Sequence, residues 1–196
     1  MNLPPGLVAI CHYFNTDPVA DDSEEYPDND VANESISEAQ SYDNIWCMDF
    51  SPITKDLFIG TTPGVEDYDI LRGLGVRLVI NMRFEHRPSQ DPHDPPLSLL
   101  WLPTIDSPFF PIPIRKLLRG AHAALETIRD GGRIYAHCAG GRHRGVAMGA
   151  AVLIAQGHDP QNAMRLIAER RSFADPFAYY IRSRIMKFAR EWSMRK

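Results

Sequence analysis

The segment RIYAHCAGGRHRGVAMGAAVLIAQ, residues 133–156, decides how this chain folds. Its first five residues, 133–137, are mostly apolar and predict a short strand. A glycine-rich turn at 139–141 follows. Residues 146–156 are then apolar nearly all round, as in a helix buried within a domain. A strand that leads through a tight turn into a buried helix is typical of an α/β sheet covered by helices.

Strands and helices alternate along the rest of the chain as well. Apolar, β-branched runs predict strands, and capping residues followed by apolar residues at helical spacing predict helices. The expected strands are 57–60, 76–82 and 99–102; the expected helices are 62–72, 114–128, one that begins at Asp159-Pro160, and one that begins at Asp175-Pro176 with Phe177, Ile181, Ile185, Phe188 and Trp192 on its buried face. This pattern predicts an α/β fold with a central, mostly parallel sheet of four to five strands and helices on both faces.

Charge divides the 196 residues into two parts. Eleven acids precede the first basic residue, Lys55, and the remaining 14 acids stand against all 21 lysines and arginines, a balance of +7. We therefore expect an acidic N-terminal extension over 1–44 and a basic domain over 45–196. The extension is either a solubilising tail or a segment that folds back over an anion site. The basic domain favours an anionic substrate or partner.

Several classes of protein do not fit the composition. The longest unbroken apolar run, Ala150–Ala155, is far shorter than a membrane span, which needs about 20 residues. Residues 1–14 contain no basic residue and so lack the positive region of a secretory signal. Three cysteines do not make a disulfide framework. No basic stripe with interleaved aromatics and no zinc spacing points to nucleic acid. We expect a soluble, cytoplasmic protein.

Residues 137–145, His-Cys-Ala-Gly-Gly-Arg-His-Arg-Gly, carry the candidate chemistry. A loop between a strand end and a helix start directs backbone N–H groups and the positive helix end at one point, which suits a tetrahedral oxyanion. Gly140 and Gly141 allow the backbone torsions that this needs. The same field favours a thiolate at Cys138, and the planar guanidinium of Arg144 can hold two phosphate oxygens.

A bare Cys-x5-Arg spacing is a weak pattern, because chance alone produces it in many arginine-rich chains. The alternative is a buried structural cysteine beside a glycine turn. Two arginines and a histidine in the same short loop favour an anion site, since such cations need a counter-charge or water.

With its flanking strand and helix, the segment from His137 to Arg144 resembles the signature of the cysteine-dependent protein tyrosine phosphatases, and the compact size resembles their dual-specificity branch. The resemblance covers 45–196. It implies a reaction without metal or cofactor, in which the Cys138 thiolate attacks phosphorus, an aspartic acid protonates the leaving oxygen, and water cleaves the phosphocysteine. It also implies that His137 hydrogen-bonds the loop backbone and supports the thiolate. The implied phosphate-binding residues, besides Arg144, are Ala139, Gly140, Gly141, Arg142, His143 and Gly145.

The resemblance places the aspartic acid on a separate loop some thirty residues before the cysteine. Asp106 lies 32 residues upstream, just beyond the strand expected to end at Leu102. A poor leaving group needs such an acid, which contributes about 10²–10⁴ in rate. The alternative for Asp106 is a turn-forming role before Ser-Pro. Asp91 and Asp94, in a proline-rich stretch, are the fallback candidates.

Gly145 departs from the family pattern, which has Ser or Thr directly after the arginine to help discharge the phosphocysteine. Discharge is then slow or assisted by another group such as His143. Arg142 and His143 either select a highly charged phosphate, such as a phosphoinositide, or point to solvent. The chain is therefore expected to be a phosphatase acting on a phosphorylated protein or small phosphomonoester, with a lipid or inositol phosphatase and a phosphate-binding pseudophosphatase as alternatives.

Two further groups of residues have open roles. Cys11 and Cys47 are candidate partners that would protect Cys138 from overoxidation, although Cys47 is also typical of a buried strand. A charged cluster after the strand expected at 76–82 either lines the rim of the pocket or is a solvated surface; it consists of Arg83, Glu85, His86 and Arg87.

Overall fold

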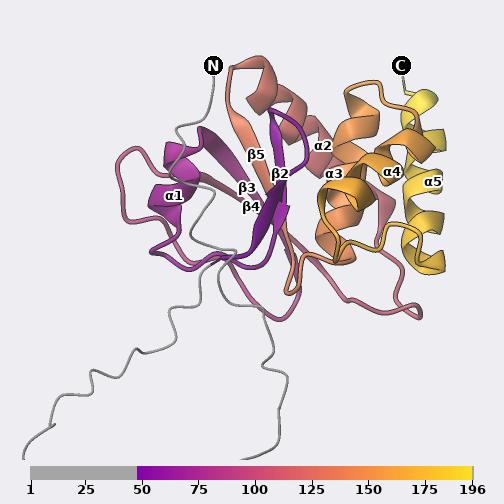
Figure 1. Cartoon of the computed structure of the whole chain (residues 1–196), viewed down its shortest axis with the longest axis horizontal. Helices are drawn as coiled ribbons and strands as arrows, with labels where there is room; N and C mark the ends of the chain where they lie inside the picture. The colour runs from indigo at the N-terminus through magenta and orange to yellow at the C-terminus, as the bar shows by residue number, and fades with distance from the viewer. Residues whose placement is uncertain (1–47, 196) are drawn as a thin grey trace, which may run out of the picture. The chain divides into compact units, whose positions relative to one another are not determined.

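The computed structural model describes residues 48–195 (Figure 1). One five-stranded sheet, in the order β1-β2-β5-β3-β4, forms its centre. The strands are β1 (Phe50–Pro52), β2 (Leu57–Gly60), β3 (Val76–Arg83), β4 (Ser98–Thr104) and β5 (Arg133–His137). The short edge strand β1 is antiparallel to β2, and the other pairs are parallel. The mostly parallel sheet of four to five strands is confirmed.

Helices cover both faces of the sheet, as the alternation predicts (Figure 1). On one face, Tyr68 and Leu71 of α1 (Tyr68–Gly73) pack against Val79 and Tyr135 of the sheet. The other face carries a larger apolar cluster from the remaining helices. These helices are α2 (Ile114–Arg129), α3 (Arg144–Ala155), α4 (Pro160–Arg170) and α5 (Tyr179–Ser193).

Helix α3 lies at the centre of the second layer. All of its residues are buried, and it contacts α2, α4, α5 and the sheet. Its sequence explains this position, because after Arg144 it contains only apolar residues and glycine and so has no face for water. The start of α3 at Arg144 is therefore held firmly against the end of β5.

The helix expected from Thr62 begins only at Tyr68, so that prediction is wrong at its start. The Thr62 hydroxyl is engaged elsewhere: it donates to the carbonyl of Cys138 and accepts from Nη1 of Arg83. A residue that looked like a helix cap instead ties the end of β2 to the loop after β5.

The last helix begins at Tyr179, later than the expected start at Asp175-Pro176. The backbone N–H of Asp175 donates to the carbonyl of Arg142, and its carboxylate accepts from the N–H of Ala178. These bonds hold the segment as a turn against the loop after β5. Phe177, expected on the buried face, is consequently 46% exposed.

The acidic extension over 1–44, Cys11 and Cys47 lie outside the described residues, and the predictions on them stay predictions. Within residues 48–195, no helix combines the length and the apolar character that crossing a membrane requires.

Candidate active site

The Cys138 loop follows β5 at the edge of the sheet where the parallel strands β2, β3 and β5 end. Cys138 comes first in the loop and is only 1% exposed. Gly141 has a φ of +60°, and a Cβ there would lie 2.7 Å from both Nη2 of Arg171 and the carbonyl oxygen of Gly60. Glycine is thus required at this position by both torsion and space. Ala139, Gly140 and Arg142 are the exposed residues of the loop.

Arg171, just after α4, holds the loop from behind. Its side chain is 2% exposed; Nε donates to the carbonyl of Gly141 (3.0 Å) and Nη2 donates to the carbonyl of Gly140 (3.3 Å). Nη2 also pairs with Oδ2 of Asp49 at 2.7 Å. Because a trans peptide sets N–H opposite C=O, the N–H groups of Gly141 and Arg142 point away from Arg171. Sequence reasoning missed this residue, since nothing local distinguishes it from its neighbour in Arg-Arg.

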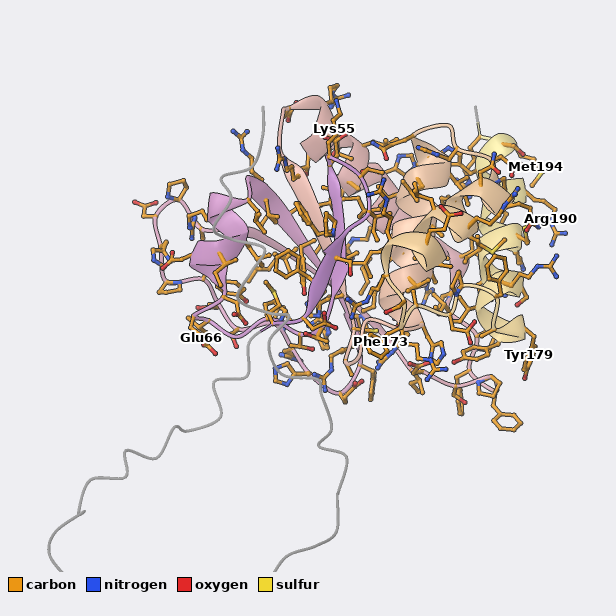
Figure 2. The ribbon with its side chains drawn as sticks, in the orientation of Figure 1. Lys55, Glu66, Phe173, Tyr179, Arg190 and Met194 are labelled. Carbon is orange, nitrogen blue, oxygen red and sulfur yellow. The ribbon has the colours of Figure 1, made fainter. Side chains whose placement is uncertain are left out.

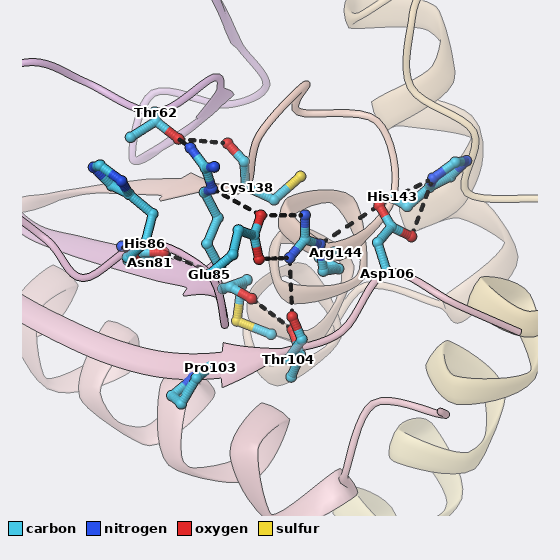
Figure 3. Close-up of polar contacts among 12 residues, drawn as sticks. Thr62, Asn81, Glu85, His86, Pro103, Thr104, Asp106, Cys138, His143 and Arg144 are labelled. Atoms are coloured by element: carbon cyan, nitrogen blue, oxygen red, sulfur yellow. Dashed lines mark hydrogen bonds and ion pairs between the residues drawn. The ribbon is translucent and has the colours of Figure 1, made fainter. Parts of the chain in front are cut away.

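The Arg144 guanidinium is buried and mostly engaged by two protein acceptors (Figure 3). Nη1 donates to Oε2 of Glu85 (3.0 Å) and to the carbonyl of Thr104 (2.9 Å), while Nη2 donates to Oε1 of Glu85 (3.2 Å). Nε is buried and has no hydrogen-bond partner in the described chain. The guanidinium has five N–H donors, and three of them are used in these bonds. The two that remain available, the Nε–H and one N–H of Nη2, lie along one edge of the group. That edge fits two oxygens of a tetrahedral anion.

Figure 3 shows the Cys138 thiol on the same side of the loop as this guanidinium. Burial acts to lower the pKa of Arg144, but the hydrogen bonds that its guanidinium donates to Glu85 and the Coulombic effects of Cys138, Glu85 and Asp106 outweigh it and raise the pKa. The nucleophile candidate and the anion-binding cation therefore share one electrostatic environment.

Glu85, on the loop after β3, orients Arg144. Hydrogen bonds from Arg144 and, more weakly, from Arg83 lower the pKa of Glu85 to about 2, so its carboxylate is charged at neutral pH. Within the charged cluster that follows β3, Arg83 and Glu85 thus belong to the site. His86 is exposed, and the guanidinium of Arg87 stacks 4.8 Å above the ring of Trp101.

Asp106 follows β4 and lies beside the Cys138 loop. Its carboxylate is 3.5 Å from Nε of Arg144 and 3.3 Å from Nδ1 of His143. The hydroxyl of Tyr180, on α5, donates to Oδ1 of Asp106 at 3.0 Å. Burial, followed by the negative charge of Asp106, raises the pKa of Tyr180 to about 12. Tyr180 is a second residue that sequence reasoning missed.

The fallback aspartates lie elsewhere. The buried carboxylate of Asp91 binds Arg72, His93 and the backbone N–H of Leu97. Asp94 lines a cavity with the first residues of β3 and β4, at the opposite edge of the sheet from the Cys138 loop. Of the three candidate acids, only Asp106 is brought to the loop.

The two cations inside the loop have different environments. Arg142 is exposed, with its backbone carbonyl held by Asp175. The His143 side chain is only 21% exposed, contacts Asp106, and packs its ring against Tyr180 with centroids 5.5 Å apart. Arg142 therefore reaches solvent and His143 is mostly buried; selection of a highly charged phosphate by either residue stays a prediction.

His137 is buried at the end of β5, 5.7 Å from the ring of Tyr135. Burial lowers the pKa of His137 to about 3, so the ring is neutral at physiological pH. Its Nδ1 has no hydrogen-bond partner between residues 48 and 195. Its support of the thiolate stays a prediction.

Gly145 is the second residue of α3 and lies against the backbone at the start of the Cys138 loop. A Cβ at this position would lie 3.1 Å from the carbonyl carbon of His137 and 3.3 Å from the N atom of Cys138. The absent side chain would thus contact the nucleophile's own backbone. Across the described part of the chain, no group of three or more His, Cys, Asp or Glu side chains is arranged to hold a metal ion.

Some known proteins are similar to this chain in sequence or in fold. No protein-family model matches the chain. Mouse (Mus musculus) dual specificity phosphatase 28 is 29% identical over 129 residues, which cover 65% of this chain and 76% of the relative. The crystal structure of human DUSP28 matches with a TM-score of 0.66 and 22% identity, covering 74% of this chain and 95% of that one. The structure of PTPMT1 in complex with PI(5)P matches with a TM-score of 0.66 and 23% identity, covering 74% and 97%.

The structural matches share the five-stranded, mostly parallel sheet and its helices. The sequence similarity to mouse dual specificity phosphatase 28 extends over most of the length of that protein. Together with the Cys-x5-Arg loop, these findings confirm that the chain resembles the cysteine-dependent protein tyrosine phosphatases, and among them the dual-specificity-like branch.

Proposed function

We propose that the chain hydrolyses phosphomonoesters through a phosphocysteine intermediate. The observation that carries this proposal is the buried Nε of Arg144, which hydrogen-bonds no group among residues 48–195 and lies 3.5 Å from the Asp106 carboxylate. A buried donor without an acceptor is costly, and an anion held by this edge of the guanidinium would satisfy it. Glu85 and Thr104 leave just that edge available.

The proposed first step forms a bond between Sγ of Cys138 and phosphorus while the bond from phosphorus to the leaving oxygen breaks. Asp106, in its acid form, gives its proton to that oxygen. Arg144 and the loop N–H groups stabilise the charge on the three remaining oxygens. In the second step, water attacks phosphorus, the S–P bond breaks, and inorganic phosphate leaves. Asp106 accepts the proton from that water and is restored.

Two substrate classes fit this chemistry. The relationship to dual specificity phosphatase 28 favours a phosphorylated protein. The fold match to PTPMT1, solved with PI(5)P, and the exposed Arg142 on the phosphate loop favour a phosphoinositide. A panel of phosphopeptides, phosphoinositides in vesicles and nucleotides would separate these classes by their relative kcat/KM.

Hydrolysis of a small aryl phosphate tests the proposed activity itself. We expect turnover by the wild type and none by Cys138→Ser, with Ser183→Ala, an exposed hydroxyl change on α5, as the matched control. Equal rates for wild type and Cys138→Ser would rule out the cysteine mechanism.

Gly145 favours a second candidate, a phosphate-binding pseudophosphatase. Because this position has no hydroxyl, the phosphocysteine lacks one source of help in its discharge. A wild type that binds inorganic phosphate but releases no alcohol from an aryl phosphate would establish the binding module in place of the enzyme.

A further inference from the structure

In the described part of the chain, the exposed phenylalanine and tyrosine side chains lie on segments that also carry residues of the candidate active site. Among residues 48–195, all six exposed phenylalanine and tyrosine side chains lie on three segments, and we call them the aromatic rim: Phe84, Phe109, Phe110, Phe173, Phe177 and Tyr179. Figure 2 shows Phe173 and Tyr179 at the lower edge of the molecule, opposite Lys55 and Met194. Exposed large aromatics concentrated in one place mark an interaction surface.

Each of the three segments is bonded to the phosphate site. Phe84 directly precedes Glu85, which holds Arg144. Phe109 and Phe110 follow Asp106 on the same loop. Phe173 and Phe177 flank Asp175, whose N–H donates to the carbonyl of Arg142, and Tyr179 directly precedes Tyr180, which donates to Asp106. The segments that carry the aromatic rim are therefore the same segments that build the candidate active site.

Basic side chains stand on or beside the segments that carry the aromatic rim. Arg142 and Arg87 are exposed, and neither forms an ion pair within residues 48–195. The acids beside them are engaged: Glu85 by Arg144, and Asp106 by Arg144 together with His143. A third acid, Asp175, caps Ala178. The surface is thus complementary to an anionic partner.

The loop that carries Asp106 favours a bilayer over a peptide as the anionic partner. Phe109 is 86% exposed and Phe110 is 60% exposed, and Pro108 and Pro111 flank the pair and stiffen the backbone. A peptide is held in a groove between side chains, whereas protruding rings enter the boundary between headgroups and acyl chains. Arginines beside the rings would meet anionic headgroups at the same depth.

We propose that the aromatic rim docks the protein on an anionic lipid bilayer, with the Cys138 loop facing the membrane, so that its substrate is a phosphomonoester borne on a lipid headgroup. This inference rests on the proposed phosphatase activity for the nature of the substrate. The docking itself depends only on the rim and the two arginines.

Co-sedimentation with vesicles tests the docking. The full chain is mixed with phosphatidylcholine vesicles and with vesicles that also contain phosphatidylserine. We expect the wild type to bind the anionic vesicles, and Phe109→Ser/Phe110→Ser to bind at least about tenfold more weakly, because burying a single phenylalanine is already worth about that factor. Met194→Ser is the matched control, since Met194 is 77% exposed and lies at the far end of the molecule (Figure 2).

Enzyme assays on the same variants link docking to substrate. The double variant should hydrolyse a soluble aryl phosphate at the wild-type rate, yet lose about tenfold on phosphatidylinositol phosphate in vesicles. Added salt should weaken vesicle binding, since part of it is electrostatic.

Three results would overturn the proposal. The first is that the wild type does not bind anionic vesicles, and the second is that the double variant binds them as tightly as the wild type. The third is that a change in the aromatic rim weakens binding of a phosphotyrosine peptide but leaves binding of vesicles unaffected. Vesicle binding without hydrolysis of any phosphomonoester would instead refute the proposed function and leave the docking intact.

Discussion

Replacing Tyr180 by phenylalanine removes one hydrogen bond from the candidate acid and leaves the ring in place. The bond from the Tyr180 hydroxyl to Oδ1 of Asp106 is 3.0 Å long. A hydrogen bond to a charged group is worth about 1.5–3 kcal/mol, and the partial exposure of this one favours the lower end. Because the pKa of Tyr180 is raised to about 12, the hydroxyl remains a donor at every pH at which the enzyme would be assayed.

Tyr180 does not touch the reacting atoms, so it is a positioning residue for Asp106. If about 1.4 kcal/mol of the energy that holds the acid in place is lost, kcat falls about tenfold. This loss should appear with a poor leaving group, such as an alkyl phosphate, which needs a proton. It should shrink towards nothing with a strongly acidic phenol, which leaves without one.

The assay is kcat for the two leaving groups, measured for the wild type, Tyr180→Phe, Asp106→Asn and the double variant. Tyr179→Phe is the matched control, because Tyr179 is 74% exposed and the change keeps the ring that packs edge-on against Tyr180. In the Asp106→Asn background, Tyr180→Phe should have little further effect. Equal losses with both leaving groups, or full additivity of the two changes, would refute a role through Asp106.

Three further predictions concern the loop and its supports. Gly145→Ser should speed discharge of the phosphocysteine, seen as a smaller burst, while Gly145→Ala should not; both should lower Tm, because the new Cβ would lie 3.1 Å from the backbone of His137. An unchanged burst in the serine variant would show that discharge is handled otherwise. Arg171→Met removes the buried cation that binds the carbonyls of Gly140 and Gly141, so the free energy of unfolding in urea should fall by about 3 kcal/mol. A change under about 0.5 kcal/mol would contradict the proposed role of Arg171 in holding the loop. The hydrogen bonds from Arg144 lower the pKa of Glu85 from 4.5 to about 2. The ionised Glu85 therefore stabilises the fold above pH 4.5, and this stabilisation is lost as the pH falls towards 2. Glu85→Gln should therefore flatten Tm against pH in that range, and an unaltered slope would argue against the ion pair.

Much of the architecture was accessible to sequence reasoning because it depends on short-range patterns. The strand at 133–137 and the buried helix after the loop are confirmed at nearly the expected residues, since apolar periodicity and glycine turns act over a few positions. Asp159 caps α4 as its Asp-Pro start predicts, accepting from the N–H groups of Gln161 and Asn162. The predicted helix start at Thr62 was wrong, because the Thr62 side chain hydrogen-bonds the carbonyl of Cys138 and does not cap a helix.

The contacts that support the site were beyond sequence reasoning because they join distant residues, although Glu85 itself belonged to a charged cluster that the sequence offered for the rim of the pocket. Glu85 and Arg144 are 59 positions apart, and Tyr180 is 74 positions from Asp106. Arg171 meets the loop carbonyls only because α4 ends beside them. No local preference marks such residues; their roles arise when the packed helices and the sheet bring their side chains together.

By itself, the sequence determined the α/β alternation, the glycine loop between strand and helix, and the spacing of Cys138 and Arg144, because each is a property of consecutive residues. Only the tertiary structure decided which of three aspartates reaches that loop, which donors of Arg144 are left for an anion, and where the exposed aromatics gather. The physical reason is that hydrogen bonding and burial at the site depend on contacts across the fold, and a linear pattern does not record them.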